Sequence, residues 1–185
     1  MKKLLIIDLE SSCHPRGNEP RGFFSEIIEI GAILLDIDSR KVDWEFQRFV
    51  RPTMFPELSM FCRQLTTITQ AEVDSGASLE SALRELALCI ADQDYRFASW
   101  GNYDCNQFKR NCERFGLPYP FHPEHLNLKA AFAAWMRGRP MGMVRALHAL
   151  HLPLEGTHHR GLDDARNIGK IAIRMLDQGW RLERS

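Results

Sequence analysis

A short apolar run near the start of the chain limits the possible folds more than any other feature. Residues 4–10 read LLIIDLE, in which four apolar residues lead into two acids. Such a run is typical of a strand buried on both faces, so other elements have to cover it from two sides. Because side chains alternate along a strand, Asp8 and Glu10 share a face with Leu4 and Ile6. The run predicts a layered sheet whose central strand ends in two carboxylates.

The order of the later patterns predicts a mixed α/β architecture. Residues 26–36 form a second expected strand, residues 38–41 a hairpin turn, and residues 43–51 an alternating edge strand. A short strand is expected at 96–100. Helical spacing of apolar residues predicts helices over 79–91, 104–115, 128–137, 142–150 and 162–179. Gly179 can end the last of them. Three strands followed by alternating helix and strand indicate a mixed sheet with helices packed on it.

Composition and charge restrict the class of protein further. The 185 residues contain no internal repeat and no stretch that looks like a linker between two domains, so residues 1–185 are expected to form one domain. The 24 Lys and Arg residues are balanced by 24 Asp and Glu residues, so the formal net charge is zero. This excludes a protein that binds nucleic acid through a large overall positive charge alone. Of the basic residues 18 are Arg, which suits phosphate contacts, although a GC-rich genome explains this equally well.

The sequence also indicates where the chain is expected to work. Five scattered cysteines without a C-x-x-C pair argue against a disulfide framework or a Cys-based zinc site. They indicate a reducing compartment, and we expect the protein to be cytoplasmic. The first apolar run stops at Asp8, too early for a signal peptide, and no apolar stretch approaches the roughly 18 residues of a membrane span.

The acidic residues point to a divalent cation. Two carboxylates at the end of a buried strand repel each other and lose hydration, and a hard cation such as Mg²⁺ or Mn²⁺ relieves both penalties. Taken alone, the pair Asp8 and Glu10 is weak evidence for a metal site, because most such pairs lie at strand ends that are exposed to solvent. Asp104 follows the strand at 96–100 on the apolar stripe of the next helix, where a helix N-cap is its simplest explanation. A third cluster, HHRGLDDARN at 158–167, places histidines before a helix that opens with two acids.

Together these patterns resemble the DEDDh family of 3′-to-5′ exonucleases. D-x-E on the first strand, a mid-chain Asp at a strand-to-helix junction and a final H-x4-D follow the order of that family. The resemblance extends over residues 3–176, in the branch that includes the histone-mRNA 3′-exonuclease and the RNA-interference suppressor nuclease. It is carried by IIDLESSC, SEIIEIGAILLD, FQRFVRP, LSMFCRQLTTITQAEV, SWGNYD and HRGLDDARNIGKIA. Two departures are Ser12, where Thr is expected, and Asn102-Tyr103, which lengthen the junction before Asp104.

The resemblance implies a fold, a cofactor and a reaction. The fold is a ribonuclease H-like mixed five-stranded sheet flanked by helices, and the cofactor is two Mg²⁺ (or Mn²⁺) ions. Asp8, Glu10 and Asp164 hold one ion, Asp8 bridges to the second, and Asp104 helps to hold that second ion through water. His159 is the general base. The implied reaction removes nucleoside 5′-monophosphates from the 3′ ends of single-stranded RNA.

The resemblance also indicates which residues contact the substrate, namely Leu9, Phe61, Leu65 and Trp100. Trp100 offers a face for base stacking, although core packing at a strand end is the simpler explanation. Phe61 and Leu65 lie in the stretch that the family uses near the 3′-terminal nucleotide, and core packing explains them as well. For Arg160, phosphate contact and a solvated position are both open.

Helical periodicity chooses between two registers of the last motif, since His158 to Asp163 and His159 to Asp164 have the same spacing. Asp164 shares the buried stripe of Ile168, Ile171 and Met175. Asp163 shares the wet stripe of Arg166, Asn167, Lys170 and Arg174. The ligand that meets Asp8 is therefore predicted to be Asp164, the base His159, and Asp163 only a favourable charge for the helix dipole.

Two other functions stay open at this point. A single-stranded DNA exonuclease in repair or proofreading fits the same motifs, because discrimination depends on contacts to the 2′-hydroxyl. A catalytically inactive nucleic-acid-binding protein fits less well, because all five motif residues are present. The first strand begins at residue 3, so we expect no separate RNA-binding domain before it and no carry-over of stem-loop recognition. The sequence gives no indication of protein partners.

Overall fold

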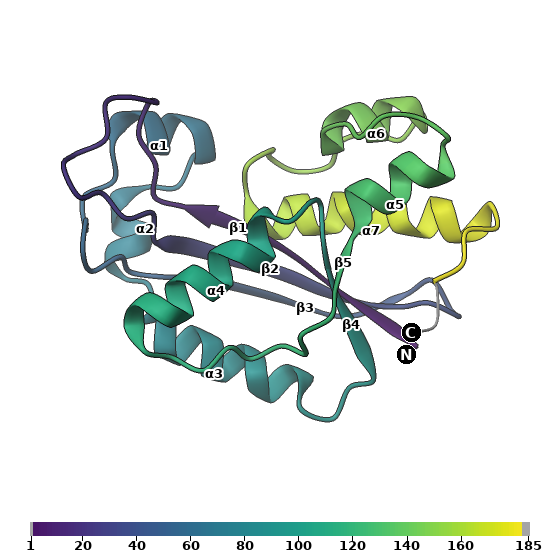
Figure 1. The fold of residues 1–185 in the computed structure, drawn as a ribbon, viewed down its shortest axis with the longest axis horizontal. Coiled ribbons are helices and arrows are strands. Elements are labelled where there is room, and N and C mark those ends of the chain that lie inside the picture. Colours follow the sequence, from purple (N-terminus) through teal and green to yellow (C-terminus); the bar gives the residue numbers. More distant parts are fainter. Residues whose placement is uncertain (1, 183–185) are drawn as a thin grey trace.

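A computed structural model describes residues 2–182 and shows one mixed five-stranded sheet at its centre (Figure 1). The strands are β1 (Lys3–Ser11), β2 (Ile27–Asp36), β3 (Val42–Phe49), β4 (Tyr95–Ser99) and β5 (His125–Asn127). Their spatial order is β3-β2-β1-β4-β5, with antiparallel pairing on the β2 side of β1 and parallel pairing on the β4 side. The predicted architecture is confirmed, with β1 in the middle and β3 at an edge.

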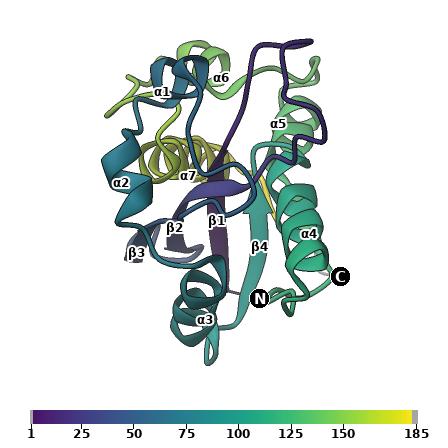
Figure 2. The same cartoon turned by 90° about the vertical axis from the view of Figure 1, so that its left-hand side faces the viewer.

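Helices cover both faces of this sheet, as the apolar run of β1 requires. The helices are α1 (Met60–Thr66), α2 (Gln70–Asp74), α3 (Leu79–Ile90), α4 (Tyr103–Phe115), α5 (Leu128–Trp135), α6 (Met143–Ala149) and α7 (Gly161–Asp177). Leu5 and Ile7 of β1 pack towards α3 and α4, whereas Leu4 and Ile6 pack towards α5, α6 and α7. Figure 2 shows these layers from the end of the sheet at which β1 finishes. Within the described residues, none of these helices is both long and apolar enough to cross a membrane.

The five helices predicted from periodicity all form, with ends that differ by at most two residues. The predicted stop of α7 is confirmed. Gly179 adopts a left-handed φ of 91°, its N–H donates to Leu176 at 3.2 Å, and the N–H of Trp180 donates to Met175 at 2.9 Å. This pair of bonds satisfies carbonyls that the end of the helix leaves free, and glycine adopts the required φ without strain.

Three short elements were not predicted from the sequence. Helices α1 and α2 are too short to show periodicity, and they begin at side-chain caps. The Ser59 side chain accepts from the Cys62 N–H, and Thr69 and Glu72 form a capping box. His125 begins β5, where its ring nitrogen lies 2.9 Å from the Ser99 hydroxyl. A strand of three residues is defined by its pairing with β4 rather than by its own pattern.

Two glycines allow α7 to lie directly against the sheet. A Cβ atom on Gly31 of β2 would overlap the backbone of Gly161 and Leu162, and one on Gly161 would lie 2.9 Å from the carbonyl oxygen of Asp8. The start of α7 therefore touches β1 and β2 without any side chain between them. This contact brings the first turn of α7 to the end of β1.

Candidate active site

Four acidic residues from three distant parts of the chain meet at the end of β1. Asp8 and Glu10 belong to β1, Asp104 is the second residue of α4, and Asp164 is the fourth residue of α7. Glu10, Asp104 and Asp164 are only 8%, 4% and 4% exposed. Carboxylate oxygens of Asp8, Glu10 and Asp164 lie within 4.8 Å of one another. The residues that the sequence singled out are therefore assembled in one cluster.

Asp104 is oriented towards β1, not towards its own helix. Its Oδ1 accepts a hydrogen bond from the N–H of Leu9 at 3.0 Å. The N-cap position of α4 is occupied by Asn102, and α4 begins at Tyr103. The N-cap explanation of Asp104 is therefore wrong, and the apolar stripe of α4 carries this carboxylate to the other acids.

Burial and mutual repulsion disfavour the charged forms of these acids. Burial first, and then the charges of Asp164, Glu29 and Asp104, raise the pKa of Glu10 to about 8. Burial raises the pKa of Asp104 to about 6, although the hydrogen bond from Leu9 opposes it. The pKa of Asp8 is raised well above its usual value by burial and by the neighbouring acids, and burial also raises that of Asp164.

The cluster fits a hard divalent cation. Over residues 2–182, no Lys or Arg forms an ion pair with any of these four acids. Buried carboxylates without a cationic partner are costly, and oxygen-only donor sets are the ones that Mg²⁺ and Mn²⁺ prefer. The chemistry of the donors therefore agrees with the metal ions that the resemblance implied.

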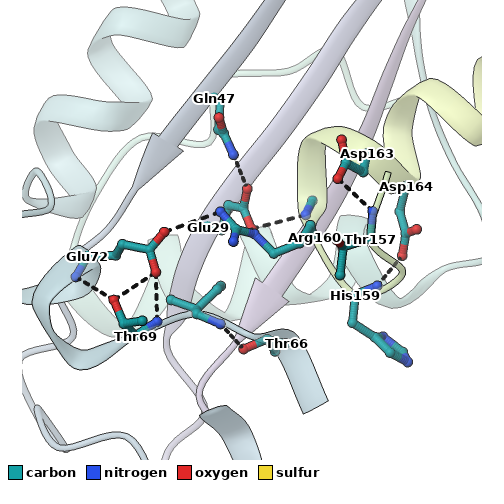
Figure 3. A network of polar contacts seen from close by, with 12 residues as sticks. Glu29, Gln47, Thr66, Thr69, Glu72, Thr157, His159, Arg160, Asp163 and Asp164 are labelled. Atoms are coloured by element: carbon teal, nitrogen blue, oxygen red, sulfur yellow. Dashed lines mark hydrogen bonds and ion pairs between the residues drawn. The ribbon is translucent and has the colours of Figure 1, made fainter. Parts of the chain in front are cut away.

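Both histidines before α7 lie beside Asp164. The N–H of His159 donates to Asp164 Oδ2 at 3.0 Å (Figure 3), and His158 Nδ1 lies 2.9 Å from the same oxygen. The two rings stack, with centroids 3.9 Å apart. Burial and the charge of His158 lower the pKa of His159, so its imidazole is neutral near pH 7, as a general base must be. The contact between His158 and Asp164 was not predicted.

Asp163 does more than favour the helix dipole. It accepts a hydrogen bond from the N–H of Thr157 at 2.9 Å, which fixes the loop before α7 (Figure 3). It also pairs with Arg166 at 3.1 Å. Asn167, placed on the wet stripe by the sequence, is fully buried. Its side chain bonds to the backbone N–H and carbonyl of Glu155, at 3.1 and 2.8 Å. The wet-stripe prediction is wrong for Asn167, because this helix face packs against its own preceding loop.

A cavity of about 370 Å³ opens in front of the acids. It is lined by Asp8, Leu9, Glu10, Ser11, Cys13, Leu65, Trp100, Tyr103, Asp104, Gly142, Met143, His158, His159 and Asp164. Of the expected substrate contacts, Leu65 is 38% exposed on the wall, whereas Leu9 is 4% exposed and mainly packs in the core. Phe61, on the same helix as Leu65, is 40% exposed and does not line the cavity.

Trp100 packs in the core and also reaches the cavity. Its Nε1–H donates to the carbonyl of Met141 at 3.0 Å, and its ring packs against Phe132 with centroids 5.6 Å apart. It is half-buried and also forms part of the cavity wall. Tyr103 and Met143 line the cavity without having been predicted. Tyr103 precedes Asp104 and could have been inferred from that position, whereas nothing in the sequence connects Met143 with the site.

The fold and the site together define the class of the protein. A mixed five-stranded sheet of this order, with clustered acids from β1, α4 and α7, is the architecture of the ribonuclease H-like exonucleases. The chain belongs to the exonuclease family, whose profile matches residues 5–172. It is thus a 3′–5′ exonuclease, a hydrolase that cleaves phosphodiester bonds.

Its relatives include proteins of bacteria and animals. A probable 3′-5′ exonuclease, KapD of Bacillus subtilis, is 35% identical over 95% of this chain and 84% of its own length. The 3′-5′ exoribonuclease 1 of Rattus norvegicus is 32% identical over 97% of this chain and 54% of its own length. The chain therefore spans about half of that relative.

Solved structures show the same fold. The nuclease domain of 3′hExo, a DEDDh family member bound to rAMP, superposes with a TM-score of 0.90 at 29% identity, over 96% of this chain and 93% of that one. The cell-death related nuclease CRN-4 superposes with a TM-score of 0.80 at 20% identity, over 96% and 64% of the two chains, and this likeness concerns the fold alone.

Proposed function

We propose that the chain removes nucleoside 5′-monophosphates from the 3′ ends of single-stranded RNA with the help of two divalent cations. The observation that carries this proposal is the cluster of four carboxylates, three of them buried and that of Asp8 partly buried, which has no Lys or Arg partner within residues 2–182. The choice of RNA is supported by relatives named exoribonucleases and by the solved nuclease domain that holds rAMP. A DNA-specific or inactive protein is less well supported by these relatives and by the complete acidic cluster.

Each acidic residue has an assigned place in this proposal. Asp8, Glu10 and Asp164 would hold one ion, and Asp8 together with Asp104 would help to hold the second. When bound, such ions lower the pKa of water and stabilise negative charge on the attacking and leaving oxygens. Either Mg²⁺ or Mn²⁺ suits these oxygen donors.

The remaining residues handle the proton and the nucleotide. His159 accepts a proton from the attacking water, which its lowered pKa and its place on the cavity wall permit. Trp100 and Leu65 form apolar walls against which a base can pack, Leu9 also lines the cavity, and Phe61 lies outside it. We also propose that residues 1–185 act as one exonuclease domain and that the five scattered cysteines reflect a cytoplasmic location.

The test is digestion of 5′-labelled single-stranded RNA and DNA of the same sequence, with Mg²⁺, with Mn²⁺ and with a chelator. Stepwise shortening of RNA from its 3′ end is expected, and the chelator should abolish it. Asp8→Asn is the matched inactive variant, because it keeps the volume of the side chain and removes its charge. Internal cleavage, or activity that survives both the chelator and Asp8→Asn, would overturn the mechanism. Faster shortening of DNA would overturn the choice of RNA.

A further inference from the structure

A buried glutamate lies directly behind the acidic cluster. Glu29 of β2 is 0% exposed and is the antiparallel partner of Glu10. Its Oε1 accepts from Gln47 Nε2 at 2.6 Å, and its Oε2 accepts from the N–H of Gly161, the first residue of α7, at 3.1 Å (Figure 3). The Oε2 atom also lies 3.4 Å from the Nε of Arg160. Glu29 thus contacts two consecutive residues of the segment that follows His159.

Arg160 is turned towards the interior of the protein. Only 21% of its side chain is exposed, and its Nη2 lies 3.4 Å from Glu72 Oε1 on α2. Its guanidinium covers the ring of Phe49 at 5.2 Å from the centroid. The sequence left phosphate contact and solvation open for this residue, and its position supports neither. All its charged contacts, in the part of the chain that the structure describes, are with protein carboxylates.

His159, which directly precedes Arg160 and Gly161, has an unusual backbone conformation. His159 has a φ of 65°, in the left-handed region that residues with a side chain seldom adopt. Such a conformation persists only where the surroundings enforce it. Asp164 accepts the N–H of His159 itself, and Glu29 holds Arg160 and Gly161, the next two residues.

We propose that Glu29 and Arg160 are positioning residues, which act on the reaction by holding His159 in place. This inference rests on the proposed function, because it assumes that His159 is the base. Glu29 fixes the chain just after His159 from within the sheet. Arg160 links the same segment to α2 through its ion pair with Glu72. Glu72 is itself fixed at the start of α2, because it accepts a hydrogen bond from the N–H of Thr69 at 2.7 Å. The base is thereby anchored to β2 and α2 without either residue touching the substrate.

The test compares Arg160→Met with Arg48→Met on a single-stranded RNA oligonucleotide at saturating Mg²⁺. Arg48 makes contacts of the same kind on the opposite face of the sheet, with Glu85 at 2.6 Å and the Phe46 ring at 5.2 Å. We expect Arg160→Met to lower kcat at least tenfold with KM changed less than threefold. Arg48→Met should remain within twofold of the wild type in both constants.

A double-mutant cycle separates positioning from a general loss of structure. If Arg160 acts through His159, adding Arg160→Met to His159→Ala should lower kcat by less than a further threefold. An equal loss in both backgrounds would overturn the inference. Should Arg160→Met fail to fold because Glu29 is left unpaired, the double variant Glu29→Gln/Arg160→Met removes the buried charge and is measured in its place.

Assaying Asp8→Asn alongside distinguishes the two levels of the argument. If the wild type shortens RNA, Asp8→Asn does not, and Arg160→Met and Glu29→Gln keep the wild-type kcat, only the positioning role is refuted. If Asp8→Asn retains the wild-type activity, the proposed function fails and the positioning inference fails with it.

Discussion

Replacing Glu10 by Gln should remove a penalty that the metal-free protein pays at alkaline pH. Glu10 is 8% exposed, and burial together with the neighbouring acids raises its pKa from 4.5 to about 8. In the unfolded chain the same group titrates near 4.5. A group with a raised folded pKa stabilises the fold fully below the unfolded pKa, and this stability is lost as the pH rises through the folded pKa. The metal-free protein is therefore expected to be less stable at pH 8 than at pH 5.

The expected size of the effect follows from the two pKa values. The difference between 4.5 and about 8, at about 1.4 kcal/mol for each pH unit, corresponds to a loss of about 5 kcal/mol in the free energy of unfolding. That is comparable to the whole stability of a small domain, about 5–15 kcal/mol. Because Glu10 is almost fully buried, solvent screening reduces this figure little, and it holds as an order of magnitude.

Urea unfolding in the presence of a chelator, at several pH values from 5 to 9, measures the effect. The free energy of unfolding of the wild type should fall steeply across this range, and that of Glu10→Gln should fall much less. Glu113→Gln, which neutralises an exposed glutamate on α4, serves as the matched control and should follow the wild type. Parallel curves for Glu10→Gln and the wild type would show that burial and the neighbouring acids do not raise the pKa of Glu10 as the structure indicates.

Three further predictions follow from the site. His159→Ala and Asp164→Asn should each lower kcat by about 10²–10⁴, whereas His158→Ala and Asp163→Asn should change it less than about tenfold. Equal losses in both pairs, which the contact of His158 with Asp164 makes worth testing, would show that the register is wrong. The rate should fall at acidic pH because His159 becomes protonated, and burial, which lowers its pKa, places this fall below the usual range of histidine; a profile that stays flat to pH 5 would argue against a histidine base. Gly31→Ala should lower the free energy of unfolding by about 1–3 kcal/mol, since its Cβ would meet the backbone at the start of α7, and an unchanged urea midpoint would contradict this close contact.

Local patterns in the sequence were sufficient for much of the fold. The apolar run before Asp8 identified the central strand, and strand alternation placed Glu10 on the same face of that strand as Asp8. Helical periodicity placed Asp164 on the buried stripe of α7, and Gly179 marked where that helix stops. Each of these inferences depends on residues that are close together in the sequence, within one strand or within one or two turns of a helix. Such short-range geometry is the same in most folds, so a sequence reveals it directly.

Other features depended on partners far away in the chain, and only the tertiary structure decided them. Asp104 would cap a helix in isolation, but the N–H of Leu9, 95 residues away, draws its carboxylate to β1. Arg160 would be solvated or bound to phosphate if nothing were buried behind it, but Glu29, 131 residues earlier, turns it inward. The register of the sheet and the close packing of α7 create these pairs. A carboxylate that is buried without a partner costs free energy. The orientation of each side chain therefore follows from the groups that the fold places beside it.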